Sequence, residues 1–202
     1  GWFDAITHSL STLSTGGFST KNASIAAFDS AYVDAVVTVF MLLASINFVL
    51  HYRFLFQFQT KSFFDGECRF FIGVALTSML FITAVLTFVT AYPAKSQHPE
   101  IYSGLGECFR VASFQVATLF SGCGFVTADF DHWPNICRVL LAVLMMIGGC
   151  AGSTTGGVKV VRFLTLMKFS LREIALLIRP QAVISLKLNG NNIEREVVSR
   201  VL

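Results

Sequence analysis

Residues 121–127 read Ser-Gly-Cys-Gly-Phe-Val-Thr, and residues 14–20 read Ser-Thr-Gly-Gly-Phe-Ser-Thr. The two stretches share a Gly-Phe-x-Thr core without a gap. Each follows an apolar segment that predicts a short helix, residues 2–14 in the first copy and 106–120 in the second. Each is followed by an acidic loop and a longer apolar segment. A recurrence of this kind predicts one supersecondary unit used twice.

The composition is that of a membrane protein. Hydrophobic residues make up 54% of the 202 residues and charged residues 13%, whereas soluble domains have about 45–50% and about 25%. The excess lies in blocks: segment 33–50 has no charge after Asp34, segment 70–92 has none, and a third block covers 139–151. A spanning helix needs roughly 20 mostly apolar residues, so the first two blocks predict spans and the third is short. We therefore expect an all-α integral membrane fold.

The positions of the charges predict which loops face the cytoplasm, because cytoplasmic loops carry an excess of Lys and Arg. Basic residues lie between the first two spans and after the third: Arg53, Lys61, Arg69, Lys159, Arg162, Lys168, Arg172, Arg179 and Lys187. The loops with Asp29, Lys95 and Asp131 are then outside. Topology accounts for the basic tail, so no nucleic-acid partner is expected.

The cysteines predict no cofactor. Cys68, Cys108, Cys123, Cys137 and Cys150 are scattered through apolar segments and form no C-x-x-C pair. An odd number at such spacings is poor evidence for a disulfide or zinc framework. We expect small buried residues and no covalently bound cofactor.

A short helix that ends at glycines without crossing the membrane is typical of a re-entrant loop. Non-helical backbone at membrane depth is tolerated where it is buried in protein or lines a watery cavity. Glycine permits the backbone angles that aim successive carbonyls at one axis, and rings of carbonyls can replace the hydration shell of K⁺. Two turns in matching contexts favour such a filter over the alternative, turns that only connect helices.

The third apolar block is interrupted by five glycines within ten residues, 148–157. Each glycine costs a helix roughly 1 kcal/mol relative to alanine, and discontinuous helices mark ion pathways in transporters. A nucleotide-binding alternative fails, because a phosphate-binding loop reads G-x-x-x-x-G-K-[ST] after a strand. Residues 156–160 read Gly-Gly-Val-Lys-Val after an apolar helix.

These motifs resemble the Trk/Ktr/HKT superfamily of potassium transporters, most closely its bacterial TrkH type. Besides the two turns, the resemblance rests on residues 47–51, Asn-Phe-Val-Leu-His, on residues 148–159 and on residues 179–183. It implies four helix–pore loop–helix repeats around one pore, with re-entrant pore helices. The implied parts are the pore helix, filter and outgoing helix of the second repeat (1–50), a cytoplasmic loop (51–69), the complete third repeat (70–170) and a cytoplasmic link toward a missing fourth repeat (171–202).

The resemblance also implies the site residues. Filter carbonyls would bind the transported K⁺ at Thr15, Gly16, Gly17, Gly122, Cys123 and Gly124. An intramembrane gate below the filter would comprise Gly148, Gly149, Gly152, Ser153, Thr154, Thr155, Gly156, Gly157 and Lys159.

The implied activity is potassium uptake across the bacterial inner (plasma) membrane by a multi-pass protein that is not an enzyme. The implied partners are the lipid bilayer, a second copy in a homodimer and a cytosolic nucleotide-binding regulatory subunit of the TrkA type. A non-conducting membrane scaffold or regulatory subunit is the alternative. Channel-like and coupled flux, with or without sodium, all fit the sequence.

Overall fold

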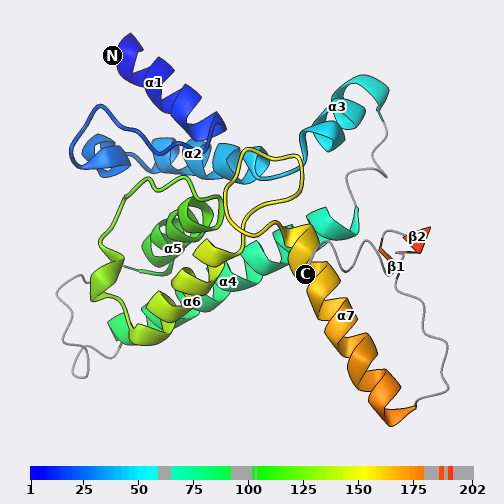
Figure 1. The fold of residues 1–202 in the computed structure, drawn as a ribbon. Coiled ribbons are helices and arrows are strands. Elements are labelled where there is room, and N and C mark those ends of the chain that lie inside the picture. The colour runs from blue at the N-terminus through cyan, green and yellow to red at the C-terminus, as the bar shows by residue number, and fades with distance from the viewer. Residues whose placement is uncertain (59–64, 92–101, 103, 180–186, 189–190, 193–202) are drawn as a thin grey trace.

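The structure, a computed structural model, describes residues 1–58, 65–91, 102, 104–179, 187–188 and 191–192 (Figure 1). The described chain is mostly helical: α1 (Trp2–Leu13), η1 (Ser24–Phe28), α2 (Ala31–Ala44), α3 (Phe48–Gln57), α4 (Gly66–Ala91), α5 (Leu105–Phe120), η4 (Phe130–His132), α6 (Asn135–Met146) and α7 (Val160–Ile178). Two residue pairs, β1 (Lys187–Leu188) and β2 (Asn191–Asn192), form an antiparallel ladder.

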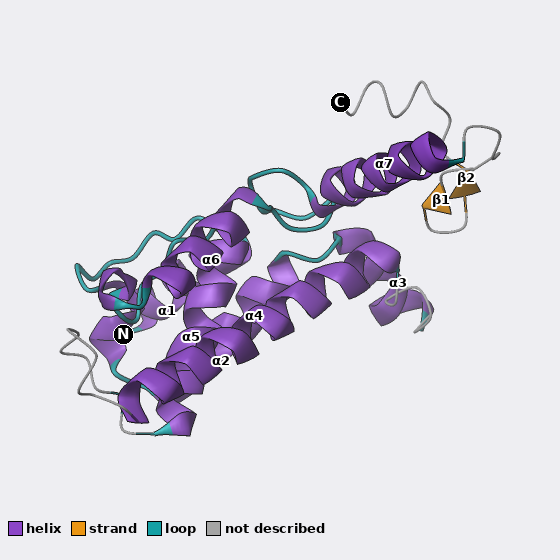
Figure 2. Cartoon of the chain, turned by 90° about the horizontal axis from the view of Figure 1, so that it is seen from below, coloured by secondary structure: helices purple, strands orange, loops and turns teal. Residues whose placement is uncertain are grey.

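Helix α5 is the centre of the bundle and packs against α2, α4 and α6 (Figures 1 and 2). Its side chains Phe114 and Phe120 are completely buried. Phe71 of α4 stacks on Phe120 with ring centroids 4.5 Å apart. Complete burial of one such side chain contributes about 1.5–3 kcal/mol, so the contact between α4 and α5 is a large part of the core, which also includes side chains of α2 and α6.

Helix α4 is the described helix that is long and apolar enough to cross a membrane by itself. The predicted span 70–92 lies in this helix, which begins earlier, at Gly66, where the Asp65 carboxylate accepts the Gly66 N–H at 2.8 Å. Tyr92 lies outside the described residues. Helix α6 is apolar but shorter, and residues 147–159 after it are non-helical, so the structure has the interruption that the glycines predict.

The prediction of one continuous span over residues 33–50 is wrong. Helix α2 ends at Ala44, α3 begins at Phe48, and the two axes differ by 99°. Asn47 explains the break locally, because its side chain accepts the Val49 N–H at 2.8 Å and caps α3. Asn is a favoured N-cap residue, and this cap competes with the continuation of α2.

Two predicted loops contain more helix than expected. Residues 51–57 of the expected loop 51–69 belong to α3, and residues 66–69 of the same expected loop form the start of α4. The expected link 171–202 begins inside α7, which continues to Ile178. Lys61, Lys95 and residues 180–183 lie outside the described residues.

Candidate functional site

The two glycine-rich turns have the same backbone hydrogen bonds. In the first turn, successive amides donate to the end of α1: Ser14 to the Leu10 carbonyl, Thr15 to Thr12 and Gly16 to Ser11, at 2.9, 3.2 and 2.9 Å. In the second turn, the equivalent amides donate to the end of α5: Ser121 to Ala117, Gly122 to Leu119 and Cys123 to Thr118, at 2.9, 3.1 and 2.9 Å. The sequence repeat is therefore also a repeat of backbone structure.

Left-handed residues occupy the same places in both turns. Thr15 and Gly17 have φ of 51° and 68°, and Gly122 and Gly124 have φ of 67° and 87°. A left-handed residue between ordinary ones reverses a peptide group, so successive carbonyls can face one side. Thr15 adopts this angle without being glycine, which costs about 1–2 kcal/mol.

The two turns meet although they are far apart in the sequence. A Cβ atom on Gly17 would lie 1.9 Å from the Cys123 carbonyl oxygen, so only glycine fits at this contact. Further along, the Ala26 N–H donates to the Val126 carbonyl at 3.1 Å. A Cβ atom on Gly124 would meet no heavy atom within 4 Å, so this residue faces open space.

A buried polar side chain of the preceding helix contacts the residues that follow each turn. His8 of α1 places its Nε2 2.9 Å from the Ser19 hydroxyl. Gln115 occupies the equivalent position in α5 and donates from its amide to the Ala128 carbonyl at 2.8 Å. Their exposed fractions are 7% and 0%. The sequence analysis missed both residues, although their equal distance from the Gly-Phe pair is a visible signal.

Residues 147–159 curl back so that the start and end of the segment pair. The Gly148 N–H donates to the Val158 carbonyl at 2.8 Å, and the Val158 N–H donates to the Met146 carbonyl at 3.2 Å. A Cβ atom on Gly148 would lie 1.9 Å from the Gly156 carbonyl oxygen. The segment between α6 and α7, here called the glycine loop (residues 147–159), therefore needs glycine at position 148.

The glycine loop lies against both turns and brings the expected gate residues to the expected filter residues. The Thr154 hydroxyl is 3.1 Å from the Leu13 carbonyl at the end of α1. The Thr15 hydroxyl donates to the Thr154 carbonyl at 3.2 Å. A Cβ atom on Gly122 would lie 3.9 Å from the Gly156 nitrogen.

Lys159 lies inside the glycine loop, and its ammonium group donates to the loop itself. Its Nζ atom is 3.4 Å from the Ser153 carbonyl and 3.3 Å from the Thr155 hydroxyl, and it also contacts the Thr155 carbonyl. The Thr155 hydroxyl accepts the Gly149 N–H at 2.8 Å. The positive charge is thus surrounded by oxygens of its own loop.

The break between α2 and α3 is joined to the glycine loop. The Cys150 N–H donates to the Ser45 carbonyl at 2.9 Å, and the Phe48 N–H donates to the Gly152 carbonyl at 3.1 Å. Asn47, which caps α3, packs beside Gly152. The break between α2 and α3 is therefore hydrogen-bonded to the break between α6 and α7.

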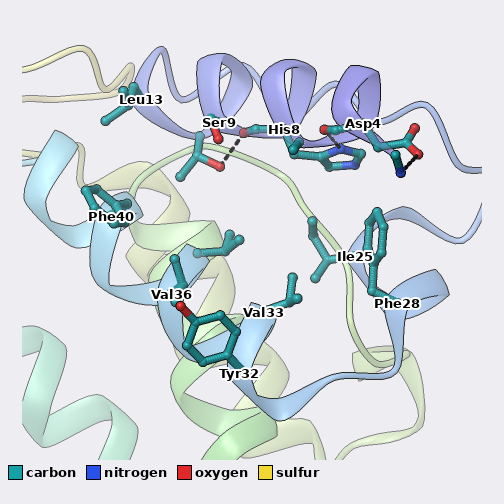
Figure 3. Close-up of a pocket in the computed structure, with 14 residues that line it drawn as sticks. Asp4, His8, Ser9, Leu13, Ile25, Phe28, Tyr32, Val33, Val36 and Phe40 are labelled. Carbon is teal, nitrogen blue, oxygen red and sulfur yellow. Dashed lines mark hydrogen bonds and ion pairs between the residues drawn. The ribbon is translucent and has the colours of Figure 1, made fainter.

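A hollow of about 530 Å³ lies between α1 and α2 (Figure 3). Its lining is mainly apolar, with Val33, Val36 and Phe40 on α2, and His8 faces it from α1 with its ring edge-on to Phe28 at 5.2 Å. None of the expected filter or gate residues lines it. Within the part of the chain that the structure describes, no three His, Cys, Asp or Glu side chains gather as a metal site.

Paired glycine turns with a broken helix against them are a backbone arrangement of the kind found in membrane proteins that carry ions, and the comparisons identify the family. The sequence profile of the TrkH family, described as cation transport protein, matches residues 1–201. The chain belongs to the TrkH family, which is a family of transporters and not of enzymes. The resemblance seen in the sequence is confirmed.

The similar proteins agree. The chain is 39% identical over 200 residues to "Trk system potassium uptake protein TrkH" of Salmonella typhimurium, covering 98% of this chain and 39% of that protein. It is 35% identical over 200 residues to "Trk system potassium uptake protein TrkG" of Escherichia coli K12, with coverage of 98% and 39%. The crystal structure of the potassium transporter TrkH from Vibrio parahaemolyticus matches with a TM-score of 0.89 at 36% identity, covering 98% of this chain and 41% of that one. The chain thus spans about two fifths of the length of these relatives.

Proposed function

We propose that this chain is part of a potassium-uptake transporter of the Trk type and contributes two walls of its selectivity filter. The observation that carries the proposal is the pair of turns that share hydrogen bonds and left-handed positions and meet at Gly17 and Cys123. The relatives named above are potassium uptake proteins, which supports the choice of ion.

In this proposal, the K⁺ ligands are the backbone carbonyls of six residues: Thr15, Gly16, Gly17, Gly122, Cys123 and Gly124. Carbonyl dipoles replace the water that K⁺ loses on entering the filter. The turns follow the C-terminal ends of α1 and α5, where the helix dipole places about half a negative charge that favours a cation. The chain needs no charged side chain among these ligands.

The glycine loop is the proposed gate. It lies against the end of α1 through Thr154 and against the second turn through Gly156, which is close to Gly122. Ser45 and Leu13, which the loop contacts, belong to segments distant in the sequence, and the start and end of the loop are bonded to each other. The loop can therefore move away from the turns as one unit. Its glycines permit the backbone changes that such a movement requires.

We further propose a multi-pass location in the bacterial inner membrane, with the Asp29 and Asp131 loops outside and Arg53, Arg69 and Arg162 inside. The contact between Ala26 and Val126 supports one common side for the two acidic loops. A second copy and a cytosolic nucleotide-binding subunit of the TrkA type are the proposed partners.

The test is rubidium uptake by the complete transporter in cells that lack their own potassium uptake, with and without residues 152–157. We expect the intact transporter to restore uptake and the deletion to raise it. A protein that reaches the membrane and moves no rubidium would favour the alternative, a non-conducting scaffold or regulatory subunit. Uptake that is unchanged by the deletion would rule out the gate.

A further inference from the structure

Glu67, at the start of α4, holds the glycine loop and α7 with one carboxylate oxygen. Its Oε1 atom accepts the Ala151 N–H at 2.7 Å and the Val161 N–H at 3.2 Å. Ala151 is in the glycine loop, and Val161 is in the first turn of α7. One side chain therefore joins the loop to the helix that follows it.

The contact is buried, and its acceptor is a carboxylate. Only 7% of Glu67 is exposed. Hydrogen bonds from N–H groups to an ionised carboxylate are roughly twice as strong as those between neutral groups. The Val161 N–H is one of the amides at a helix N-terminus that lack a partner within the helix, and the dipole of α7 favours a negative charge at that end.

The other hydrogen bonds that hold the loop from outside join neutral groups. Examples are the Cys150 N–H to the Ser45 carbonyl, the Phe48 N–H to the Gly152 carbonyl and the Thr154 hydroxyl to the Leu13 carbonyl. The net contribution of such a bond is smaller than that of a bond to a charged group. Glu67 adds a formal charge, and it binds the loop at Ala151, whereas the loop contacts the turns at Thr154 and Gly156.

We propose that Glu67 is a positioning residue that latches the glycine loop in its closed place and couples it to α7. This inference rests on the proposed function, in which the loop is the gate. Release of the loop requires Ala151 to leave the carboxylate, and a displacement of α7 draws the Glu67 side chain with Val161 and away from Ala151. A movement of α7 is thereby transmitted to the gate.

The first measurement is rubidium uptake by the complete transporter with Glu67→Ala, Glu67→Gln or the control Asp65→Asn. Asp65 lies two residues away, and its carboxylate binds the Gly66 N–H instead. We expect Glu67→Ala to raise uptake by roughly tenfold, since two bonds to a charged group are lost. Glu67→Gln keeps an acceptor oxygen without the charge and gives a smaller rise, and Asp65→Asn stays at the wild-type level.

The second measurement reports the loop without ion flux. The purified complete transporter is treated with a charged water-soluble maleimide, and labelled cysteines are located by mass spectrometry. Cys150 is next to Ala151 and 1% exposed, whereas Cys137 in α6 is 0% exposed and reports general unfolding. The latch predicts that both Glu67 variants label Cys150 faster while Cys137 stays protected.

The outcomes separate the latch from the gate. Cys150 that stays protected in both variants, or Cys150 and Cys137 that become labelled together in both, would overturn the latch. If Glu67→Ala unfolds the protein, the decision rests on Glu67→Gln by the same criterion. Faster labelling of Cys150 with unchanged rubidium uptake would keep the latch and remove the proposed gating role of the loop.

Discussion

The two turns and the glycine loop are both rich in glycine, but they are held in opposite ways. Each turn is bonded to the last residues of the helix before it, as the amides of Gly16 and Cys123 show. The glycine loop is bonded to Ser45, Leu13 and Glu67, which belong to other parts of the chain. A turn therefore keeps its shape as long as its helix exists, whereas the loop can lose its position without any helix unfolding.

The glycines of the turns and of the glycine loop also differ in what a side chain at their position would contact. At Gly17 a Cβ atom would strike the other turn, and at Gly148 it would strike the loop's own Gly156. Glycine at position 17 allows the two turns to be in contact, and glycine at position 148 allows the two ends of the glycine loop to be in contact. Substitutions at these positions should therefore fail in different ways.

The largest effect is expected for Gly17→Ala. The new methyl group would overlap the Cys123 carbonyl at 1.9 Å, and the left-handed angle adds about 1–2 kcal/mol of strain. We expect rubidium uptake to be nearly abolished and the Tm of the purified transporter to fall. The matched control is Gly16→Ala, where φ is not left-handed and the closest atom is the Phe18 ring at 3.2 Å. Equal uptake by the two variants would contradict the contact between the turns.

An intermediate effect is expected for Gly148→Ala. Its methyl group would lie 1.9 Å from the Gly156 carbonyl oxygen, and overpacking of this kind costs about 1–3 kcal/mol. The strain falls on the closed loop, so we expect rubidium uptake to rise by roughly tenfold. Gly156→Ala is the control in the same loop, because its Cβ atom would meet nothing within 4 Å. A rise in both variants, or in neither, would argue against a closed loop held by close packing.

The smallest effect is expected for Thr154→Val. The change removes a hydroxyl that is 3.1 Å from the Leu13 carbonyl and 3.3 Å from the Ala44 carbonyl. A neutral hydrogen bond contributes about 0.5–1.5 kcal/mol, so uptake should rise about two- to tenfold. Thr154→Ser keeps the hydroxyl and should behave as wild type. Identical uptake in the two variants would show that the loop does not depend on this contact.

The sequence predicted the parts of the fold that depend on local pattern. The helices before the two turns, the apolar helix α4 and the interruption after α6 follow from hydrophobic blocks and glycines. The break at Asn47 was not predicted, because it lies within a mostly apolar run. The hydrogen bond from Cys150 to Ser45 beside the break comes from a segment distant in the sequence. The capping preference of Asn is the signal that was present.

The candidate site was predictable in its backbone and not in its supports. Glycines at 17 and 148 mark close approaches that any side chain would prevent. His8 and Gln115 look like ordinary polar residues of short helices until the exit of each turn is placed beside them. Glu67 lies near Asp65 in the sequence without a motif around it, and only the folded chain brings it to Ala151.

The most direct test of the paired filter turns is the ratio of rubidium to sodium uptake with and without Gly124→Ser in the complete transporter. Gly124 has φ of 87°, and its Cβ atom would enter open space beside the contact of the turns. A side chain there changes the backbone angle and the space in front of the carbonyls. We predict that wild type prefers rubidium strongly and that Gly124→Ser lowers the ratio by roughly tenfold or more, because a filter depends on its carbonyl geometry. An unchanged ratio in a protein that reaches the membrane would contradict the claim that these turns select the ion.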